Sequence, residues 1–412
     1  MSNNGKQQDV VIVGAARTPT GRMGGALSSL TAPQLGGKAI ESAVSRAGVD
    51  PRSIYEVIMG HVVQAGAGQA PARQAALNSG LPPAVGATTI NKVCGSGLKA
   101  VMLAANAIQS GEGDVFVAGG QESMSNAPYL VHGARDGIRF GHGEFKDSLL
   151  TDGLWCAFED WAMGSAAEFI ARQFEVSRAE MDEFALRSHR LAAEATVNGR
   201  FADEIVPIEI KGRKGSHTVT NDESIRATFS EDGYELGTSV ELLGKLRPAF
   251  EADGQVTAGN APGLNDGAAA VVLTSRAEAE QQGLTPLARI VGYTHASLEP
   301  KWLFAAPARA MPRLLQRIGW TFADVDLIEL NEAFAAQALA NGVELTQAGH
   351  EWDWDKVNVH GGAVALGHPI GASGARLLVT LLHALRQRNG RRGLVSLCLG
   401  GGEAVALAVE LE

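Results

Sequence analysis

Apolar and polar positions along the chain follow strand and helix periods in alternation. The stretch DVVIVGAARTP is a β-branched run closed by glycine and proline, which predicts a buried strand that enters a loop. Helical spacing follows over residues 35–47, then a strand region at SIYEVIMGHVV and a short helix at PARQAALNSG. This alternation is typical of an α/β protein.

A similar order of elements occurs early and late in the chain. Each copy has a glycine-rich turn, a helical run, a strand and a glycine pair: INKVCGSGLKA to DVFVAGGQES, and GASGARLLVTLLHALRQRNG to GLVSLCLGGGEA. Gly97 and Gly374 stand 277 positions apart, and Gly119 and Gly400 stand 281 apart. Two units at nearly one offset predict a duplicated α/β domain whose turns face each other across a pseudo-dyad. A chance likeness between glycine-rich turns is the alternative.

Residues 126–253 lose this alternation and are charged and irregular. One helix is clear within them, because Ser177 and Glu180 form a capping box and apolar residues follow at helical spacing. We interpret the region as an insertion that lies over the core and offers loops for gripping a ligand.

Composition narrows the class of protein. Of the 412 residues, 45% are hydrophobic and 19% charged, and 50 glycines against 15 prolines favour tight turns over disorder. The formal net charge of -10 argues against a general nucleic-acid binder, so an anionic ligand has to meet a local basic patch.

Cysteine usage and the two ends of the chain bear on its compartment. Three cysteines are an odd and sparse set that indicates reduced thiols rather than a disulfide framework. The start MSNNGKQQ is polar, no apolar run approaches the ~18 residues of a membrane span, and the last residues match no targeting address. We therefore expect a cytoplasmic protein without a membrane segment.

Cys94 stands in a glycine-flanked turn ahead of a helix. The free N–H groups and the positive end of that helix would favour a thiolate, which is the nucleophilic form of cysteine. A structural role is the alternative, because free cysteine is among the most buried residue types.

His368 stands between a glycine and a proline in the glycine-rich stretch NVHGGAVALGHPIGASGAR. Such a segment is ordered where its backbone passes close to another group, and an imidazole there could take the proton of the cysteine. A histidine that only hydrogen-bonds its loop is the alternative. His360 would supply a metal partner, but no third ligand stands at a usual zinc spacing, so we expect no metal.

Two further stretches carry candidate site groups. Cys398 ends an apolar strand in SLCLGGGEA, where the N–H groups of Gly400 and its neighbours could bind an oxyanion; a core cysteine is the alternative. In IELNEAFAAQA, Asn331 and Glu332 interrupt an apolar strand as a helix begins, either as an N-cap or as site groups at the strand's carboxyl end. The chain lacks a complete dinucleotide fingerprint, phosphate loop or serine-hydrolase elbow.

Four stretches together, NKVCGSGLKA, NEAFAAQA, GGAVALGHPIGASGAR and CLGGGEA, resemble the thiolase family, which includes acetyl-CoA acetyltransferases and 3-ketoacyl-CoA thiolases. The likeness runs from Val10 to the C-terminus. It implies an α/β thiolase fold of two similar βαβαβαββ domains related by a pseudo-dyad, with an inserted loop domain. On this chain the N-terminal domain would take residues 1–125 and 254–284, the loop domain 126–253 and the C-terminal domain 285–412.

The resemblance also implies catalytic roles. Cys94 would carry the acyl group, His368 would activate it as a base, and Cys398 would move a proton at the α-carbon of the acyl-CoA. One oxyanion hole would consist of His368 and a water held by Asn331, and the other of the backbone N–H groups of Cys94 and Gly400. Acyl-CoA and CoA would be the substrates, with no metal or organic cofactor.

Substrate and CoA contacts follow by position as well. The implied positions are Arg226, Leu154, Met163, Ala258, Ala333, Phe334 and Leu303. Because CoA is anionic, Lys211, Arg213 and Lys214 of the insertion join Arg226 as candidates for binding its phosphates. The lysines are also consistent with a solvated charged loop.

Departures from the family pattern surround the expected acyl and pantetheine pocket. Ala162 stands where related sequences often have histidine, Pro262 where a serine is common, and Leu303 and Phe304 lie in a stretch that differs from the short-chain enzymes. We expect an acetyl-CoA C-acetyltransferase that works by a ping-pong mechanism through acyl-Cys94. The alternatives are a longer-chain 3-ketoacyl-CoA thiolase and a non-catalytic acyl-CoA-binding or partner protein.

The stretch RDGIRFGHGEF resembles a loop that the family uses for tetramer contacts. The resemblance therefore implies a homo-oligomer, either a dimer or a tetramer.

Overall fold

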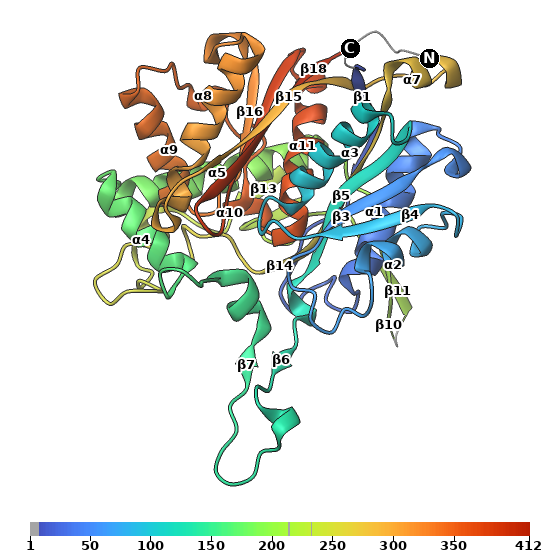
Figure 1. The fold of residues 1–412 in the computed structure, drawn as a ribbon. Helices are drawn as coiled ribbons and strands as arrows, with labels where there is room; N and C mark the ends of the chain where they lie inside the picture. Colours follow the sequence, from blue (N-terminus) through green and yellow to red (C-terminus); the bar gives the residue numbers. More distant parts are fainter. Residues whose placement is uncertain (1–7, 213–214, 232) are drawn as a thin grey trace.

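A ten-stranded mixed sheet forms the centre of the molecule (Figure 1). The computed structural model describes residues 8–212, 215–231 and 233–412. The strands follow the order β16-β17-β18-β15-β1-β14-β5-β3-β4, and β2 pairs with β14 beside them. Their bounds are β1 Val10–Arg17, β2 Gly21–Arg22, β3 Glu56–Gly60, β4 Gly86–Ile90, β5 Val115–Ser123, β14 Asn265–Ser275, β15 Ala288–Ser297, β16 Leu327–Leu330, β17 Arg392–Leu399 and β18 Glu403–Leu411.

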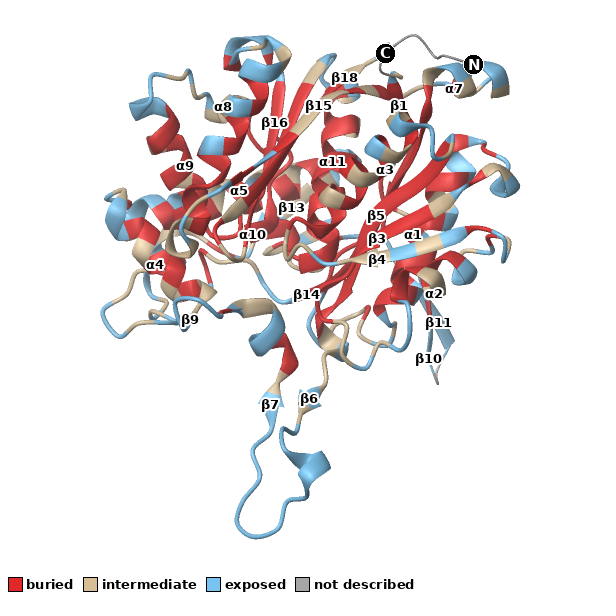
Figure 2. Cartoon of the chain, in the orientation of Figure 1, coloured by how far each residue is buried: buried red, intermediate tan, exposed pale blue. Residues whose placement is uncertain are grey.

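Helices cover both faces of this sheet, so most strand residues are buried (Figure 2). On the inner face, α3 (Ser96–Ser110) and α11 (Ile370–Gln387) pack against each other, and α11 contacts strands of both halves. On the outer face, α1 (Ala32–Ala47) covers β1, β5 and β14, and α8 (Pro307–Ile318) covers β15, β17 and β18. The other helices of the two halves are α2 Pro71–Asn78, α7 Arg276–Gln282, α9 Ala335–Gln347 and α10 Ala363–Leu366.

The two halves of the sheet repeat one topology. The order β3-β5-β14-β1 in the first half is mirrored by β16-β17-β18-β15 in the second, with the first pair parallel and the others antiparallel in each half. A bulge interrupts β1 between Ile12 and Gly14 and β15 between Ile290 and Gly292. The predicted duplication is confirmed, and the repeated bulge is a second, independent mark of it.

The register of the strands corrects one alignment made from the sequence. When the two bulges are superposed, Gly119 opposite Ala270 corresponds to Ser396 opposite Ala406. The equivalent of Gly119 is therefore Ser396, 277 positions away, and not Gly400, which lies in the turn after β17. The 281-residue match was wrong because a glycine pair carries no register, whereas ladder hydrogen bonds do.

Gly97 and Gly374 lie at a close contact between α3 and α11. A Cβ on Gly97 would lie 2.8 Å from the Ala375 backbone nitrogen, and one on Gly374 would lie 2.6 Å from the Leu98 backbone nitrogen. Backbone atoms cannot move away as a flexible side chain can, so both positions require glycine. This crossing brings together the N-terminal ends of the two helices, which carry Cys94 and His368.

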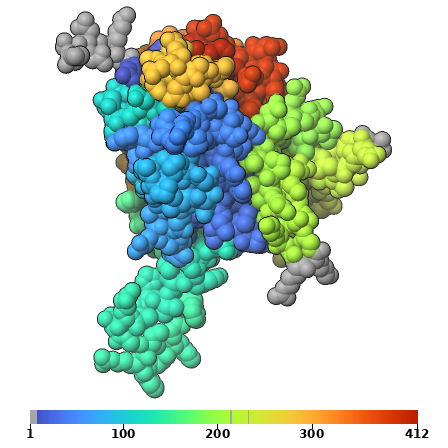
Figure 3. Space-filling view, turned by 90° about the vertical axis from the view of Figure 1, so that its right-hand side faces the viewer, coloured from blue at the N-terminus to red at the C-terminus, as the bar shows by residue number. Residues whose placement is uncertain are grey.

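The insertion contains helices α4 (Met163–Gln173), α5 (Arg178–Val197) and α6 (Val240–Gly244) and several hairpins. The capping box of Ser177 and Glu180 starts α5 as predicted. The hairpins are β6 Tyr129–Leu130 with β7 Lys146–Asp147, β8 Trp155–Cys156 with β9 Trp161–Ala162, β10 Ile208–Gly212 with β11 Gly215–Val219, and β12 Ala227–Ser230 with β13 Gly233–Leu236. The loop between β6 and β7 extends away from the body of the molecule (Figure 3).

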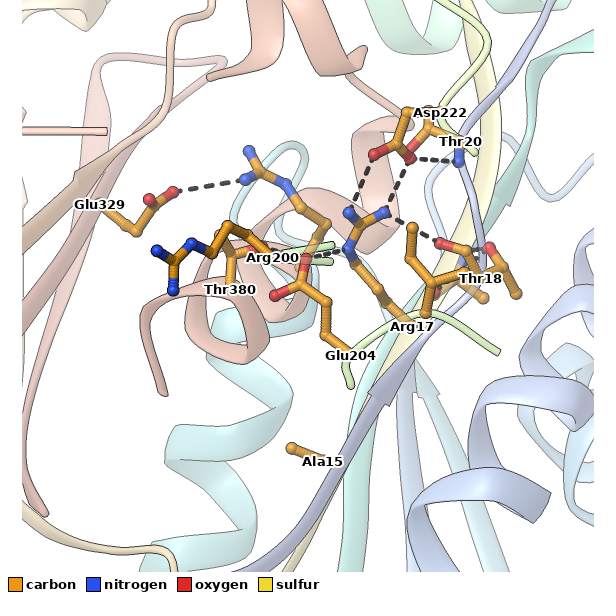
Figure 4. Close-up of polar contacts among 12 residues, drawn as sticks. Ala15, Arg17, Thr18, Thr20, Arg200, Glu204, Asp222, Glu329 and Thr380 are labelled. Carbon is orange, nitrogen blue, oxygen red and sulfur yellow. Dashed lines mark hydrogen bonds and ion pairs between the residues drawn. The ribbon is translucent and has the colours of Figure 1, made fainter. Parts of the chain in front are cut away.

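A buried ionic network joins the insertion to the core (Figure 4). Arg17 of β1, fully buried, pairs with Glu204 at 2.6 Å and with Asp222 at 2.7 Å, both from the insertion. Thr380 of α11 donates to the same Glu204 carboxylate at 3.1 Å. Because breaking a buried pair leaves an uncompensated charge, this network fixes the insertion over the sheet.

Within the described part of the chain, no helix is both long and apolar enough to cross a membrane.

Candidate active site

Cys94 occupies a strained turn between β4 and α3. Val93, the residue before it, has φ of +46°, a left-handed conformation that is costly for a β-branched side chain. The Ser96 hydroxyl holds the turn, because it accepts a hydrogen bond from the Lys92 N–H at 2.8 Å and donates one to the Val93 carbonyl at 2.6 Å. Cys94 therefore stands at the N-terminal end of α3, as the sequence predicted.

The Cys94 sulfur is a protonated thiol at neutral pH. Burial raises the pKa of the Cys94 thiol to about 12; hydrogen bonds from the N–H groups of Cys94 itself and of Gly400 lower it less, and the charge of Glu122 raises it further. The N–H groups act in the direction expected from the sequence, because they lower the pKa, but desolvation has the larger effect and the thiol stays protonated. The thiol needs a base.

His368 is prepared to be that base. Its Nδ1 lies 2.6 Å from the Ser373 hydroxyl, which donates its only proton to the Pro369 carbonyl at 2.9 Å. The proton between the ring and Ser373 must therefore sit on Nδ1, which leaves the lone pair of Nε2 free. Burial, together with the positive charge of Arg376, lowers the pKa of His368 to about 4, so the ring is neutral at pH 7.

Asn331 lies beside the free nitrogen of His368. Its side-chain nitrogen is 3.5 Å from His368 Nε2, and among the described residues no group donates to its buried carbonyl oxygen. The N-cap alternative for Asn331 is wrong, because α9 begins later, with Phe334 at its N-cap. The neighbouring Glu332 has a structural role, since its carboxylate accepts hydrogen bonds from the Ser188 hydroxyl of the insertion at 2.7 Å and from the Asn358 side-chain amide at 2.9 Å.

Cys398 lies near the end of β17, at 1% exposure. Burial raises the pKa of the Cys398 thiol well above its usual value, and repulsion from the ionised form of Cys94 raises it further. The second effect requires the two sulfurs to be near each other, although they are 304 positions apart in the sequence.

One pocket of about 810 Å³, including its open mouth, contains these groups. Cys94, His368, Cys398 and Gly400 line it together, while Asn331 lies behind His368. Among the predicted substrate contacts, those lining the pocket are Leu154, Met163, Leu303, Ala333 and Phe334. The departures Ala162, Pro262 and Phe304 line it as well, so they face the space that a substrate would occupy.

The predicted CoA-phosphate groups are more scattered. Arg226 and Ala258 do not line the pocket, but the Arg226 guanidinium donates to the Ala258 carbonyl at 2.6 Å. Lys211 is exposed on the β10–β11 hairpin, whose apolar side chains pack with the cluster around α1, and it does not line the pocket. Arg213 and Lys214 lie outside the described residues.

Sequence reasoning missed two residues of the site. Ser373 orients His368, and Phe250 lines the pocket, where it packs on Gly164 so closely that a Cβ there would meet its ring at 2.2 Å. A serine in the first turn of the helix that follows His368 was a usable signal, because hydroxyls there commonly bond back to the preceding loop. Phe250 had no local signal.

Comparisons with known proteins agree with this geometry. The family model for "Thiolase, N-terminal domain" matches residues 10–277, and the one for "Thiolase, C-terminal domain" matches residues 284–411. A relative from Cupriavidus necator named acetyl-CoA acetyltransferase is 52% identical over 98% of this chain and 99% of its own length. A relative of the same name from Pseudomonas aeruginosa is also 52% identical, with the same coverage.

Solved structures give the same result. The crystal structure of the Bacillus anthracis acetyl-CoA acetyltransferase superposes with a TM-score of 0.93 at 45% identity, over 99% of this chain and 100% of that one. The acetyl-CoA acetyltransferase from Syntrophomonas wolfei superposes with a TM-score of 0.94 at 41% identity, with the same coverage. With both halves matched and Cys94, His368 and Cys398 in one pocket, this chain belongs to the thiolase family.

Proposed function

We propose that the protein is an acetyl-CoA C-acetyltransferase, which joins two acetyl-CoA molecules into acetoacetyl-CoA and CoA or catalyses the reverse thiolysis. The observation that carries the proposal is the convergence of two thiols with raised pKa values and one neutral imidazole in a single apolar pocket. The name shared by relatives about 50% identical over the whole chain supports it. Thioester chemistry at these groups needs no metal or organic cofactor.

The first half-reaction forms a thioester on Cys94. The free Nε2 of His368 takes the Cys94 proton as the sulfur attacks the carbonyl of acetyl-CoA. Cys398 then protonates the departing CoA sulfur and becomes a thiolate. A thiol with a raised pKa is a strong nucleophile and a strong base once its proton has left, so burial helps both sulfurs after ionisation.

The second half-reaction forms the carbon–carbon bond. The Cys398 thiolate removes the α-proton of a second acetyl-CoA, and the resulting carbanion attacks the acetyl group on Cys94. Cys94 leaves and recovers its proton from His368, so the enzyme returns to its starting state. The N–H groups of Cys94 and Gly400, which converge on the sulfur, meet the oxyanion of the acyl group. His368 and a water on the unpartnered oxygen of Asn331 meet the enolate oxygen of the second substrate.

Acylation of the protein tests the proposal directly. After incubation with acetyl-CoA, intact mass and peptide mapping should find one acetyl group on Cys94, and Cys94→Ser should carry none. Cys398→Ser lacks the acid that protonates the departing CoA sulfur, so it should acquire the acetyl group more slowly and form no acetoacetyl-CoA. Absence of any adduct on Cys94 would contradict the enzyme proposal and favour a non-catalytic acyl-CoA-binding protein.

A longer-chain 3-ketoacyl-CoA thiolase is the second candidate. The small Ala162 side chain faces the pocket, and Pro262 supplies neither a hydroxyl nor a backbone N–H there. Thiolysis assayed over 3-ketoacyl-CoAs of increasing length separates the two. A preference for acetoacetyl-CoA supports the first candidate, and a preference for longer chains supports the second.

The proposal also includes a binding residue for the CoA phosphates and a contact with a second copy of the chain. Arg226, beside Ala258, is our candidate for the nucleotide end of CoA. Ile138, Phe140 and Phe145, on the loop between β6 and β7, are largely exposed, as expected if the loop packs against another subunit in a homo-oligomer. Light scattering of Phe140→Asp beside the wild type tests the role of the loop in the oligomer.

A further inference from the structure

The N-terminus of α11 is capped by a residue from the other half of the molecule. Pro369, at the N-cap position of α11, makes no side-chain cap hydrogen bond. The Gly371 N–H in the first turn instead donates to the Glu122 carboxylate at 2.9 Å. Glu122 belongs to β5, 249 residues earlier in the chain. A carboxylate at this place meets the positive end of the helix, only three residues after His368.

Glu122 also holds the loop that follows β3. Its carboxylate accepts hydrogen bonds from the Val62 N–H at 3.1 Å and the Val63 N–H at 3.2 Å, and it lies 3.3 Å from His61 Nε2. The side chain is fully buried, and no described lysine or arginine lies within ion-pairing distance of it. A buried carboxylate with three backbone donors is a fixed anchor between three segments.

The contact between β5 and α11 is tight enough to exclude side chains. A Cβ on Gly120 would lie 2.0 Å from the Gly371 carbonyl oxygen, and one on Gly371 would lie 2.9 Å from the Gln121 carbonyl oxygen. The strand and the helix therefore touch backbone to backbone beside the Glu122 hydrogen bond. No side chain lies between the two backbones here, so a displacement of β5 at Glu122 is transmitted directly to the start of α11.

The duplication shows what the carboxylate changes. At the 277-residue offset, Gly371 corresponds to Cys94 and Glu122 corresponds to Leu399. Leu399 packs at the start of α3, where a Cβ on Gly95 would meet its methyl group at 2.1 Å. The apolar Leu399 leaves the Cys94 N–H free for the sulfur, whereas Glu122 occupies the equivalent N–H of Gly371.

We propose that Glu122 is a positioning residue for the reaction: it fixes the start of α11, and hence His368, against the Cys94 loop, and its negative charge acts on the Cys94 sulfur. The effect on turnover rests on the proposed function. The effect on the sulfur does not, because it can be measured without any acyl-CoA.

Cys94 packs against Val62, Val63 and Ile370, beside the N–H groups that Glu122 accepts, so the carboxylate lies close to the sulfur. Its charge raises the pKa of the Cys94 thiol, as the smallest effect after burial and the N–H groups of Cys94 and Gly400. It therefore stabilises the protonated thiol until His368 accepts the proton. The other titratable or charged groups on the segments that meet here are His61 after β3, Lys92 in the Cys94 turn, Lys99 of α3, His368 before α11, Cys398 near the end of β17 and Glu403 at the start of β18.

Glu122→Gln tests the proposal with two readouts. An amide nitrogen cannot accept a hydrogen bond, so at least one backbone contact is lost together with the charge. We expect kcat for thiolysis to fall roughly 10- to 100-fold through misplacement of His368, with KM nearly unchanged. The rate of iodoacetamide labelling of Cys94, followed by peptide mapping, should be measured against pH. The profile should shift to lower pH, because a lower thiol pKa gives more thiolate at each pH. A purely structural role would not move the labelling profile in this direction.

Glu122→Asp and Glu403→Gln separate charge from geometry. Glu122→Asp keeps the charge but shortens the side chain, so kcat should fall while the labelling profile stays in place. Glu403→Gln removes a carboxylate that pairs with Lys92 in the same turn at 31% exposure, and solvent screening should leave both readouts close to wild type.

A folded Glu122→Gln protein with wild-type kcat or an unshifted labelling profile would overturn the proposal. If that variant does not fold, wild-type kcat in Glu122→Asp overturns it instead. Failure of the proposed acetyltransferase activity would be seen separately, as absent turnover in the wild type with the labelling shift still present.

Discussion

Replacing Ser373 by alanine tests how His368 is prepared as a base. In the wild type the Ser373 hydroxyl accepts a hydrogen bond from the Nδ1–H of His368 at 2.6 Å and donates one to the Pro369 carbonyl. Nε2, which faces Asn331, therefore carries no proton. Alanine removes the acceptor and leaves a buried N–H without a partner. The tautomer with its proton on Nε2 then becomes more populated, because it avoids the unpaired N–H. In that tautomer Nε2 cannot take the Cys94 proton.

The structure sets the size of this effect. A buried donor left without its partner costs about 1–3 kcal/mol, which corresponds to roughly 5- to 150-fold in the population of the reactive tautomer. We expect kcat for thiolysis of acetoacetyl-CoA to fall within that range. KM should change little, because Ser373 is 1% exposed and does not line the pocket.

Steady-state thiolysis and Cys94 acetylation measured by mass spectrometry are the assays. The matched control is Thr380→Val on the same helix, which removes the hydroxyl that donates to Glu204 at 3.1 Å. It should lower the free energy of unfolding by about 1 kcal/mol and leave kcat close to wild type. Wild-type kcat in a folded Ser373→Ala protein would refute the assigned tautomer, and an equal loss in Thr380→Val would show that any buried hydroxyl of α11 has the same effect.

Two further predictions concern stability. Burial lowers the pKa of His189 to about 3 and of His360 and His368 to about 4, so below the ordinary pKa of 6.5 the unfolded chain binds protons that the folded chain does not. The free energy of unfolding should fall from pH 6.5 toward pH 4, by up to about 1.4 kcal/mol per pH unit for each histidine; urea unfolding at several pH values checks this, and a flat profile would contradict it. Gly97→Ala should destabilise the protein by about 1–3 kcal/mol and lower kcat, whereas Gly244→Ala, where a Cβ meets nothing within 4 Å, should be neutral or stabilising in the same unfolding assay.

Much of the fold could be predicted from the sequence because its signals are local. The β-branched run that forms β1, the capping box that starts α5 and the glycine that ends α3 depend on residues within a few positions of one another. The duplication was also readable, since both copies keep a glycine where α3 and α11 cross. The strand alignment was not, because register is set by hydrogen bonds and by the bulges at Gly14 and Gly292.

The sequence by itself determined which side chains form the site: Cys94, His368, Asn331 and Cys398 were named from their turns and from the family resemblance, and the structure brings them together. Only the tertiary structure decided their ionisation. The helix end at Cys94 predicted a thiolate, but desolvation by packed segments from both halves and the insertion raises the pKa of that thiol to about 12. Burial and hydrogen-bond partners depend on residues hundreds of positions apart, as in the contact between Glu122 and Gly371, and no local pattern encodes them.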